Sequence, residues 1–222
     1  MNKEKIVESL ATITLLFDEP LMNYTFTKTG GPADVLAFPK KQEEVKQIID
    51  YCRIHDIPWM VLGNASNLIV QDGGIRGVVI MLTEMKQIHV KGTMVIAEAG
   101  ASLIDTTYAA LAESLTGFEF ACGIPGSVGG AVYMNAGAYG GEIKDVFAEV
   151  DLLLEDGTLK TLTKEEMVFS YRHSKVQELR AIVLEARFSL QTGDYEAIKA
   201  RMDELTELRQ SKQPLEYPSC LS

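Results

Sequence analysis

Glycine is concentrated in one stretch of this chain, and that stretch limits what the chain can fold into more than any other feature. The segment between positions 117 and 141 holds eight of the 18 glycines, together with Pro125, and no periodic pattern organises it. Glycine adopts backbone conformations that other residues rarely adopt, and it lets other groups approach the backbone closely. We therefore interpret the stretch as a long loop that is selected for its backbone conformation. The glycines are Gly117, Gly123, Gly126, Gly129, Gly130, Gly137, Gly140 and Gly141.

The spacing of these glycines excludes two standard nucleotide sites. No Gly-Lys-Ser/Thr forms a P-loop, and no Gly-x-Gly-x-x-Gly opens a helix after a strand. The remaining interpretation is a loop that presses its backbone against a flat or extended ligand, with Ser127 and Asn135 as polar contacts. A purely structural glycine-rich loop is the alternative.

A second candidate segment, Gly-Asn-Ala-Ser-Asn at residues 63–67, lies between two expected strands. Its small residues would let backbone amides converge on an anion such as a diphosphate, while Ser66 and Asn67 donate from their side chains. An ordinary β-turn explains the same pattern.

A third candidate is the compact polar cluster Ser-Tyr-Arg-His-Ser at residues 170–174. Arg172 could stabilise a developing carboxylate or enolate as a fixed bidentate donor. A solvated surface loop is the competing interpretation.

Regular elements are expected on both sides of the glycine-rich stretch. Apolar spacing predicts a helix over 41–53, short apolar runs predict strands at 59–62, 68–70 and 78–82, and this order indicates a small α/β unit. Further along, we expect a strand at 94–97 and a helix whose apolar face runs from Leu103 to Leu115. A hairpin over 146–162 around Asp156-Gly157, a strand at 181–190 and a helix at 195–212 complete the expected elements.

Charge and composition exclude several classes of function. The net charge of −10 disfavours binding to nucleic acid, because the basic residues are not gathered into one patch. The three cysteines and three histidines are scattered without ligand spacing, so we expect no metal and no disulfide framework. The apolar runs are too short to span a membrane, and the N-terminus lacks the features of a secretory signal, so we expect a cytoplasmic protein.

The three candidate segments, in this order and at these separations, resemble the family of UDP-N-acetylenolpyruvoylglucosamine reductases, within the vanillyl-alcohol-oxidase-type flavoproteins. The similarity begins at Asn23-Tyr-Thr-Phe-Thr-Lys-Thr-Gly-Gly-Pro-Ala-Asp34 and extends to Pro218. Its most specific part is the run of 20 residues from Gly123 to Glu142. Ala65 stands where the family often has glycine, and we expect this small residue to change little.

The resemblance implies an α+β fold: a two-part FAD-binding domain of the vanillyl-alcohol-oxidase (PCMH) type, with the C-terminal substrate domain missing. The expected parts are an N-terminal α/β part at 1–83, a glycine-rich α+β part at 84–193, and a helix with the start of the substrate domain at 194–222. We expect that helix to expose an apolar face where the following domain would pack.

The resemblance also implies a reaction. NADPH would reduce bound FAD, which would then reduce the enolpyruvyl group of a UDP-sugar in peptidoglycan synthesis, and hence serve cell-wall biogenesis, cell shape and cell division. No obligate protein partner is expected. Substrate contacts are expected from Tyr139, Tyr171 and Arg172. The implied cofactor-binding residues are Gly63, Asn64, Ala65, Ser66, Asn67, Ile124, Pro125, Ser127, Gly129, Gly130, Tyr133, Asn135 and Gly137.

Two residues match catalytic positions of the family. Arg172 matches an arginine that stabilises an enolate-like intermediate, and Ser222 falls in register with a proton-donating serine. Leu221 replaces the family's glycine before that serine, and the resemblance implies that the family's catalytic glutamate is absent from this chain. The alternatives are therefore a catalytically incompetent FAD-binding fragment and a related flavin oxidase that acts on another alcohol or sugar.

Overall fold

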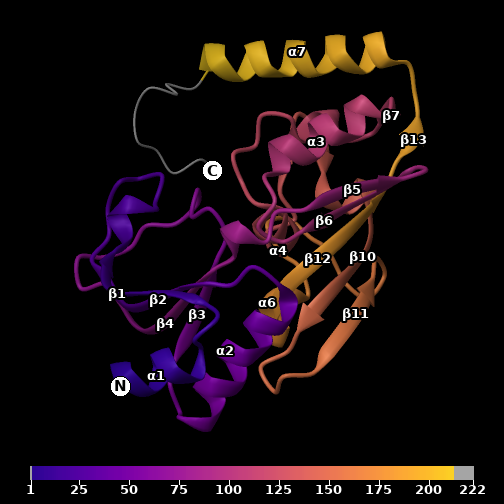
Figure 1. Ribbon diagram of the computed structural model, residues 1–222. Coiled ribbons are helices and arrows are strands. Elements are labelled where there is room, and N and C mark those ends of the chain that lie inside the picture. Colours follow the sequence, from indigo (N-terminus) through magenta and orange to yellow (C-terminus); the bar gives the residue numbers. More distant parts are fainter. Residues whose placement is uncertain (1, 213–222) are drawn as a thin grey trace.

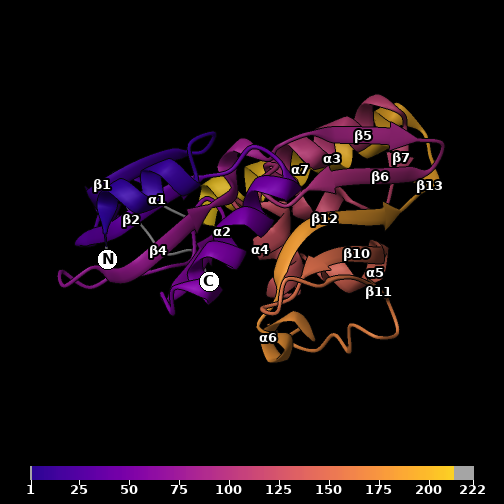
Figure 2. The same cartoon turned by 60° about the horizontal axis from the view of Figure 1, so that its bottom comes forward.

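Two β-sheets meet around a short central helix in the computed structural model, which describes residues 2–212 (Figures 1 and 2). The first sheet has the strand order β1-β2-β4-β3. β1 pairs antiparallel with β2, whereas β2 and β3 both run parallel to β4. The strands are β1 (Thr14–Pro20), β2 (Pro32–Phe38), β3 (Trp59–Leu62) and β4 (Ile75–Met81).

The helix α2 (Gln42–Ile54) connects β2 to β3 and confirms both the expected helix and the small α/β unit. Val45, Ile48, Ile49 and Cys52 form its buried face. Burying an aliphatic side chain of this size contributes about 1.5–3 kcal/mol relative to exposure, so this face fixes the helix on the sheet. Acidic residues in the first turn and a basic one in the last turn complement the helix dipole.

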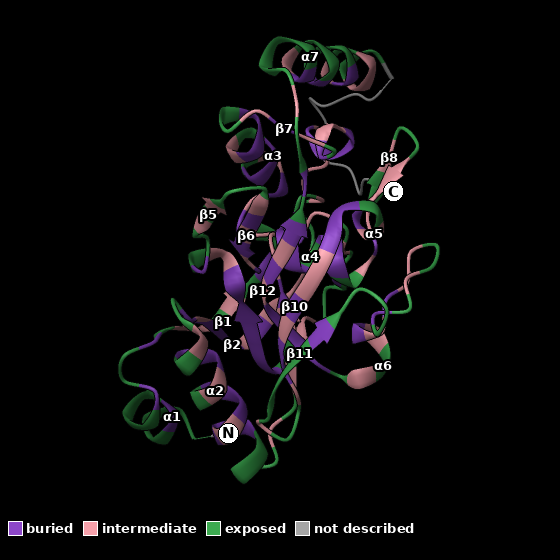
Figure 3. Ribbon diagram, turned by 90° about the vertical axis from the view of Figure 1, so that its right-hand side faces the viewer, coloured by how far each residue is buried: buried purple, intermediate pink, exposed green. Residues whose placement is uncertain are grey.

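The second sheet has the order β11-β10-β12-β6-β5, and all its neighbouring strands are antiparallel. β10 and β11 form the expected hairpin around Asp156-Gly157, and β6 and β12 confirm two further expected strands. Figure 3 shows buried and half-buried residues mixed along β10 and β12. The strands are β5 (Ile88–Lys91), β6 (Met94–Glu98), β10 (Phe147–Leu153), β11 (Leu159–Thr163) and β12 (Ile182–Ser189).

Short elements fill the space between and around the sheets. Within residues 2–212, no helix is long and apolar enough to cross a bilayer. The remaining α-helices are α1 (Lys3–Ser9), α3 (Leu103–Ala112), α4 (Val128–Tyr133), α5 (Ile143–Val146), α6 (Val176–Leu179) and α7 (Tyr195–Lys212). The 3₁₀ turns are η1 (Leu21–Asn23), η2 (Leu82–Glu84) and η3 (Glu119–Ala121), and the two-residue strand pairs are β7 (Leu115–Thr116) with β13 (Gln191–Thr192) and β8 (Gly137–Ala138) with β9 (Gly141–Glu142).

One hydrophobic cluster joins the two sheets. It includes Ile80 on β4, Val128 on α4 and Phe188 on β12, all fully buried. Because interiors pack as densely as organic crystals, a core shared in this way fixes the sheets relative to each other. The region between the two sheets is therefore fixed by packing against both of them.

The expected strand at 68–70 is wrong, because these residues form a loop. Ile69 is exposed, and Val70 packs instead against Gly30 in the loop that precedes β2. A run of three apolar residues is therefore explained by burial of single side chains rather than by strand pairing.

The expected loop at 117–141 also needs correction, since it contains the helix α4 and the 3₁₀ turn η3. The helix contains Gly129 and Gly130, whose low helix propensity concealed it. Upstream, the expected helix ends at Ala112, and Leu115 lies in β7 rather than on the helix face.

The helix α7 is confirmed over 195–212, but its apolar face is not exposed. Ile198, Met202 and Leu205 are buried against Leu111 of α3 and Cys122, which follows η3. Figure 3 shows exposed residues on the outer side of this helix. The α3–η3 surface thus covers the apolar face that was expected to be exposed.

Candidate functional site

Residues 63–67 form a loop directly after β3, at the carboxyl end of the parallel strands. Open parallel sheets commonly bind ligands at that end. Within residues 2–212, no protein oxygen accepts a hydrogen bond from the backbone N–H of Asn64 or Ser66. The loop therefore has amides available to an anion in this part of the chain.

Ala65 in this loop has a left-handed backbone, with φ of 50°. It is buried, and its carbonyl accepts a hydrogen bond from the backbone N–H of Phe26 at 3.4 Å. A residue with a Cβ pays about 1–2 kcal/mol in this conformation, which glycine avoids. The alanine is therefore not neutral, as its size alone had indicated, but carries backbone strain.

In the second glycine-rich segment, the amides at the start of α4 are already engaged. At the start of α4, the N–H groups of Val128 and Gly129 donate to the carbonyls of Ala101 and Ala99 at 2.9 and 2.8 Å. The Ser127 hydroxyl caps the helix by accepting from the N–H of Gly130 at 3.4 Å. A Cβ on Gly129 would lie 2.9 Å from the Cβ of Ala99, so this glycine permits close packing of α4 on the end of β6.

The two segments, some 60 positions apart, touch each other. A Cβ built on Gly63 would lie only 1.9 Å from the Ser127 hydroxyl oxygen and 2.9 Å from its Cβ. A Cβ on Gly126 would lie 3.9 Å from the hydroxyl oxygen of Ser66. Residues 63–67 and the segment that begins at Gly123 therefore form facing walls, and glycine at position 63 allows them to approach.

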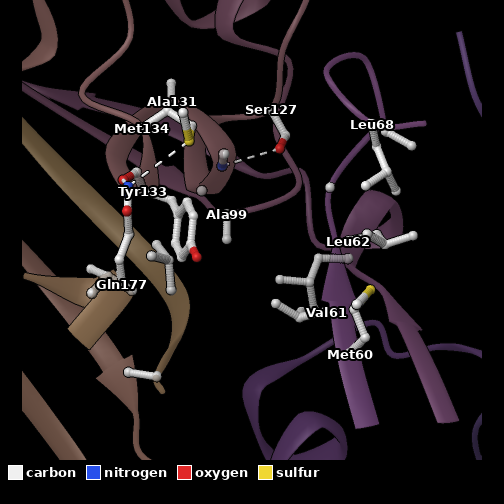
Figure 4. A pocket seen from close by; sticks show the side chains of 18 of the residues that line it. Met60, Val61, Leu62, Leu68, Ala99, Ser127, Ala131, Tyr133, Met134 and Gln177 are labelled. Atoms are coloured by element: carbon white, nitrogen blue, oxygen red, sulfur yellow. Dashed lines mark hydrogen bonds between the residues drawn. The ribbon is translucent and has the colours of Figure 1, made fainter. Parts of the chain in front are cut away.

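Between these walls lies a cavity of about 1420 Å³, which we call the large cavity. In Figure 4 the Tyr133 ring projects from α4 toward the side chains of Met60 to Leu62 on β3. Other parts of its wall come from α6, the start of β12, the end of α2 and the α7 residue Arg209. The expected cofactor residues that line it are Gly63, Asn64, Ala65, Ser66, Asn67, Ile124, Pro125, Ser127, Gly129, Gly130, Tyr133 and Gly137.

Arg172 lies where the large cavity meets a smaller one of about 320 Å³. It sits in a tight turn in which Ser170 and His173 exchange backbone hydrogen bonds of 3.1 and 3.2 Å. Its own φ of 51° is left-handed. The other two expected substrate contacts, Tyr139 and Tyr171, line the smaller cavity, so the structure brings all three together.

Asn135 does not line the large cavity, although it lines the smaller one. It is buried, and its amide nitrogen donates to a carboxylate oxygen of Glu142 at 2.9 Å and to the carbonyl of Ser170 at 3.0 Å. Its side-chain oxygen accepts from the N–H of Lys144 at 3.0 Å. The hydrogen bonds from Lys144 and Asn135 lower the pKa of the Glu142 carboxyl. Asn135 thus ties the glycine-rich segment to the turn that carries Arg172.

Arg209 is a cavity residue that sequence patterns did not identify. Its side chain packs on Gly123, where a Cβ would lie 2.9 Å from the Arg209 Cδ. Within residues 2–212 no carboxylate forms an ion pair with it, and burial lowers the pKa of its guanidinium. An arginine in this setting offers planar donors to an anion in the cavity.

Two other features bear on the chemistry of the site. Burial raises the pKa of the Cys52 thiol to about 12, so this cavity residue stays protonated and is a poor nucleophile. Among residues 2–212, no group of three or more histidine, cysteine, aspartate or glutamate side chains is arranged to hold a metal ion. Ser222 lies outside the described residues.

Comparison with known proteins identifies the family. Residues 33–163 match the FAD binding domain family. The chain is 70% identical over 220 residues to the UDP-N-acetylenolpyruvoylglucosamine reductase of Enterococcus faecalis, covering 99% of this chain and 73% of that relative. The chain belongs to the UDP-N-acetylenolpyruvoylglucosamine reductase family. The resemblance inferred from the three segments is thereby confirmed.

Solved structures support the same conclusion. The UDP-N-acetylenolpyruvylglucosamine reductase of Thermus caldophilus superposes with a TM-score of 0.78 at 33% identity, over 94% of this chain and 72% of that one. A cholesterol oxidase from Brevibacterium sterolicum superposes with a TM-score of 0.63 at 16% identity, over 82% of this chain and 38% of that one. The reductase family thus shares its α+β FAD-binding fold with a distant oxidase, as the expected fold class required.

Proposed function

We propose that this chain binds FAD in the large cavity and, with NADPH as reductant, reduces the enolpyruvyl group of UDP-N-acetylenolpyruvoylglucosamine to give UDP-N-acetylmuramate for peptidoglycan. Family membership supports the reaction. The observation that carries the cofactor assignment is the contact between Gly63 and Ser127, because it brings both glycine-rich segments to one cavity.

The residues present fit FAD. The large cavity exceeds the roughly 300–1,000 Å³ typical of small-molecule sites, as an extended dinucleotide requires. Its two walls consist largely of glycine, alanine and serine, which leave room for a flat ring system. The backbone N–H groups of Asn64 and Ser66 have no acceptor within residues 2–212, which suits a diphosphate.

We assign the diphosphate of FAD to residues 63–67. The remainder of FAD falls to the second wall, formed by Ile124, Pro125, Ser127, Gly129, Gly130, Tyr133 and Gly137. Asn135 holds that wall in place through its three hydrogen bonds rather than reaching into the cavity. When bound, the flavin supplies the hydride for the reduction.

The substrate would occupy the smaller cavity, with Tyr139 and Tyr171 beside it. Arg172, at the border of the two cavities, would stabilise negative charge that develops on the enolpyruvyl group as it accepts hydride. A proton donor must then act on the neighbouring carbon, and Ser222 holds that role in our proposal. We retain residues 1–83, 84–193 and 194–222 as the proposed parts of the chain, and the cytoplasm as its proposed location.

The test is NADPH oxidation by the FAD-loaded chain, with and without the UDP-enolpyruvyl sugar. Substrate-dependent oxidation that is lost in Arg172→Ala supports the proposal. Bound FAD without substrate-dependent oxidation contradicts it and supports the catalytically incompetent alternative. Oxygen consumption with an alcohol or sugar in the absence of NADPH would support the oxidase alternative.

A further inference from the structure

Gln177, on the short helix α6, is a cavity residue that joins two parts of the site. Its side-chain amide nitrogen donates to the carbonyl of Tyr133 at 2.9 Å and to the carbonyl of Arg172 at 3.1 Å. Figure 4 shows the Gln177 side chain reaching toward the backbone at the end of α4. One amide group thus connects the wall that we assign to FAD with the turn that carries Arg172.

The backbone of Arg172 is in a conformation that needs support. Its φ of 51° lies in the left-handed region, which is unfavourable for a residue with a Cβ. Residues persist in such conformations when surrounding contacts over-determine them, and they gather at functional sites. The hydrogen bond from Gln177 to the Arg172 carbonyl is one such contact.

Neighbouring hydrogen bonds attach the ends of the same turn but act on other residues. The Ser174 hydroxyl donates to the carbonyl of Tyr133 at 2.8 Å, and the Asn135 amide donates to the carbonyl of Ser170 at 3.0 Å. These contacts set where the turn lies. Gln177 contacts the Arg172 peptide itself, so it controls how that residue is oriented within the turn.

We propose that Gln177 is a positioning residue that holds the Arg172 backbone against the end of α4, so that the guanidinium stays at the border of the two cavities. The role of Arg172 in this statement rests on the proposed function. Gln177 contributes through its N–H donors, because both of its partners here are carbonyl oxygens.

Three substitutions separate the donor function from shape. Gln177→Met keeps the length but removes both polar groups, and Gln177→Glu keeps the shape but replaces the donor with a second acceptor. Gln177→Lys retains N–H donors at similar reach, so it should preserve the contacts. Gln47→Met is the matched control, because Gln47 is an exposed glutamine on a helix outside both cavities.

The first measurement does not depend on activity. Amide hydrogen exchange of Ser170 and His173 reports the closed turn, because these two residues exchange backbone hydrogen bonds. We expect exchange at both amides to accelerate about ten-fold in Gln177→Met and Gln177→Glu, and to change less than about two-fold in Gln177→Lys and in the control. Unchanged exchange in Gln177→Met would overturn the proposal.

The second measurement asks whether Gln177 acts through Arg172. The FAD-loaded chain is reduced chemically and mixed anaerobically with the UDP-enolpyruvyl sugar, and the rate of flavin reoxidation is followed. Since small misplacements of a catalytic group are costly, we expect a loss of about ten-fold or more in Gln177→Met, with recovery in Gln177→Lys. In an Arg172→Ala background, Gln177→Met should change the rate by less than about two-fold.

Hydrogen exchange and flavin reoxidation can contradict the proposal independently of each other. Faster exchange in Gln177→Met with an unchanged reoxidation rate would reduce Gln177 to a structural tie and overturn its positioning role. An equal loss of rate in the presence and absence of Arg172 would overturn it as well. If Arg172→Ala leaves reoxidation unchanged, the proposed role of Arg172 fails, whereas the exchange measurement still decides whether Gln177 holds the turn.

Discussion

The two glycine-rich segments form facing walls of one cavity, yet they use small residues for different purposes. In the first, at residues 63–67, the backbone N–H groups of Asn64 and Ser66 have no acceptor within residues 2–212. In the second, the N–H groups at the start of α4 donate to protein oxygens, and Gly129 packs against Ala99. The first wall leaves backbone donors available to a ligand, whereas the start of α4 on the second wall uses its donors and Gly129 for packing.

Glycine content alone therefore does not locate an anion site. A helix N-terminus commonly binds phosphate, but the first N–H groups of α4 donate hydrogen bonds to the carbonyls of Ala99 and Ala101. Arg209 packs on Gly123 of the second wall and brings a guanidinium to the cavity there. Substitutions on the first wall should therefore act mainly on ligand affinity, and those at the start of α4 mainly on stability.

The largest effect is expected where the two walls touch. In Gly63→Ala the new Cβ would lie 1.9 Å from the Ser127 hydroxyl oxygen, so the walls must separate. Overpacking of this kind costs about 3 kcal/mol, or roughly 100-fold in the affinity for FAD measured by fluorescence titration. Gly73→Ala is the control, because nothing lies within 4 Å of a Cβ there. Adding Ser127→Gly should restore much of the loss, whereas FAD affinity within two-fold of wild type in Gly63→Ala would contradict the close approach of the two walls at Gly63.

On the second wall, Gly129→Ala should lower stability rather than affinity. Its Cβ would lie 2.9 Å from that of Ala99, and we expect a loss of about 1–3 kcal/mol in urea unfolding. The folded fraction should still bind FAD within about three-fold of wild type. Gly130→Ala, in the same helix, meets only the Ser127 hydroxyl at 3.4 Å, so it should cost far less. Equal losses in the two variants would contradict the packing role of Gly129.

Arg209→Met is expected to change ligand affinity rather than stability. Removing a half-buried guanidinium that has no carboxylate partner within residues 2–212 should leave stability unchanged or slightly higher. Affinity for FAD or for the UDP-sugar should fall about ten-fold and lose part of its dependence on salt. Arg201→Met is the control on the same helix, because Arg201 is exposed and pairs with Glu204. A stability loss without any change in either affinity would argue against an anion role.

The smallest effects are expected from two serine substitutions, one on each wall. Ser66→Ala should weaken FAD binding by a few-fold and leave unfolding unchanged, because Ser66 lines the large cavity. Ser127→Ala removes the cap of α4, whose bond to the N–H of Gly130 is long at 3.4 Å, and should cost about 0.5–1 kcal/mol of stability. FAD affinity is measured by isothermal titration and stability by urea unfolding for both variants. A loss of stability in Ser66→Ala and a loss of affinity in Ser127→Ala would contradict these roles.

Sequence patterns predicted the elements whose signals are local. The helix α2, the helix α7 and the hairpin around Asp156-Gly157 each carry their own periodicity or turn residues, and the structure confirms them. The strands β1 and β2 were missed because neither has a clean alternation: β1 contains Asp18 with a positive φ, and β2 begins with Pro32.

At the site, patterns indicated which segments matter but not how each residue is used. The large cavity contains both glycine-rich segments and Arg172, as the motifs indicated. Gln177 and Arg209 were missed because their importance arises only when α6 and α7 fold onto distant residues. The strain at Ala65 was also hidden, since a backbone angle has no signature in residue size.

A titration of the purified chain with FAD, followed by flavin fluorescence and by thermal unfolding, tests most directly whether the large cavity binds FAD. We expect one FAD per chain and a stability gain of about 2.7 kcal/mol when free FAD reaches 100 times its dissociation constant. Gly63→Ala should need far more FAD to reach the same gain. A folded wild-type chain that neither quenches flavin fluorescence nor gains stability with FAD would contradict the assignment of the large cavity.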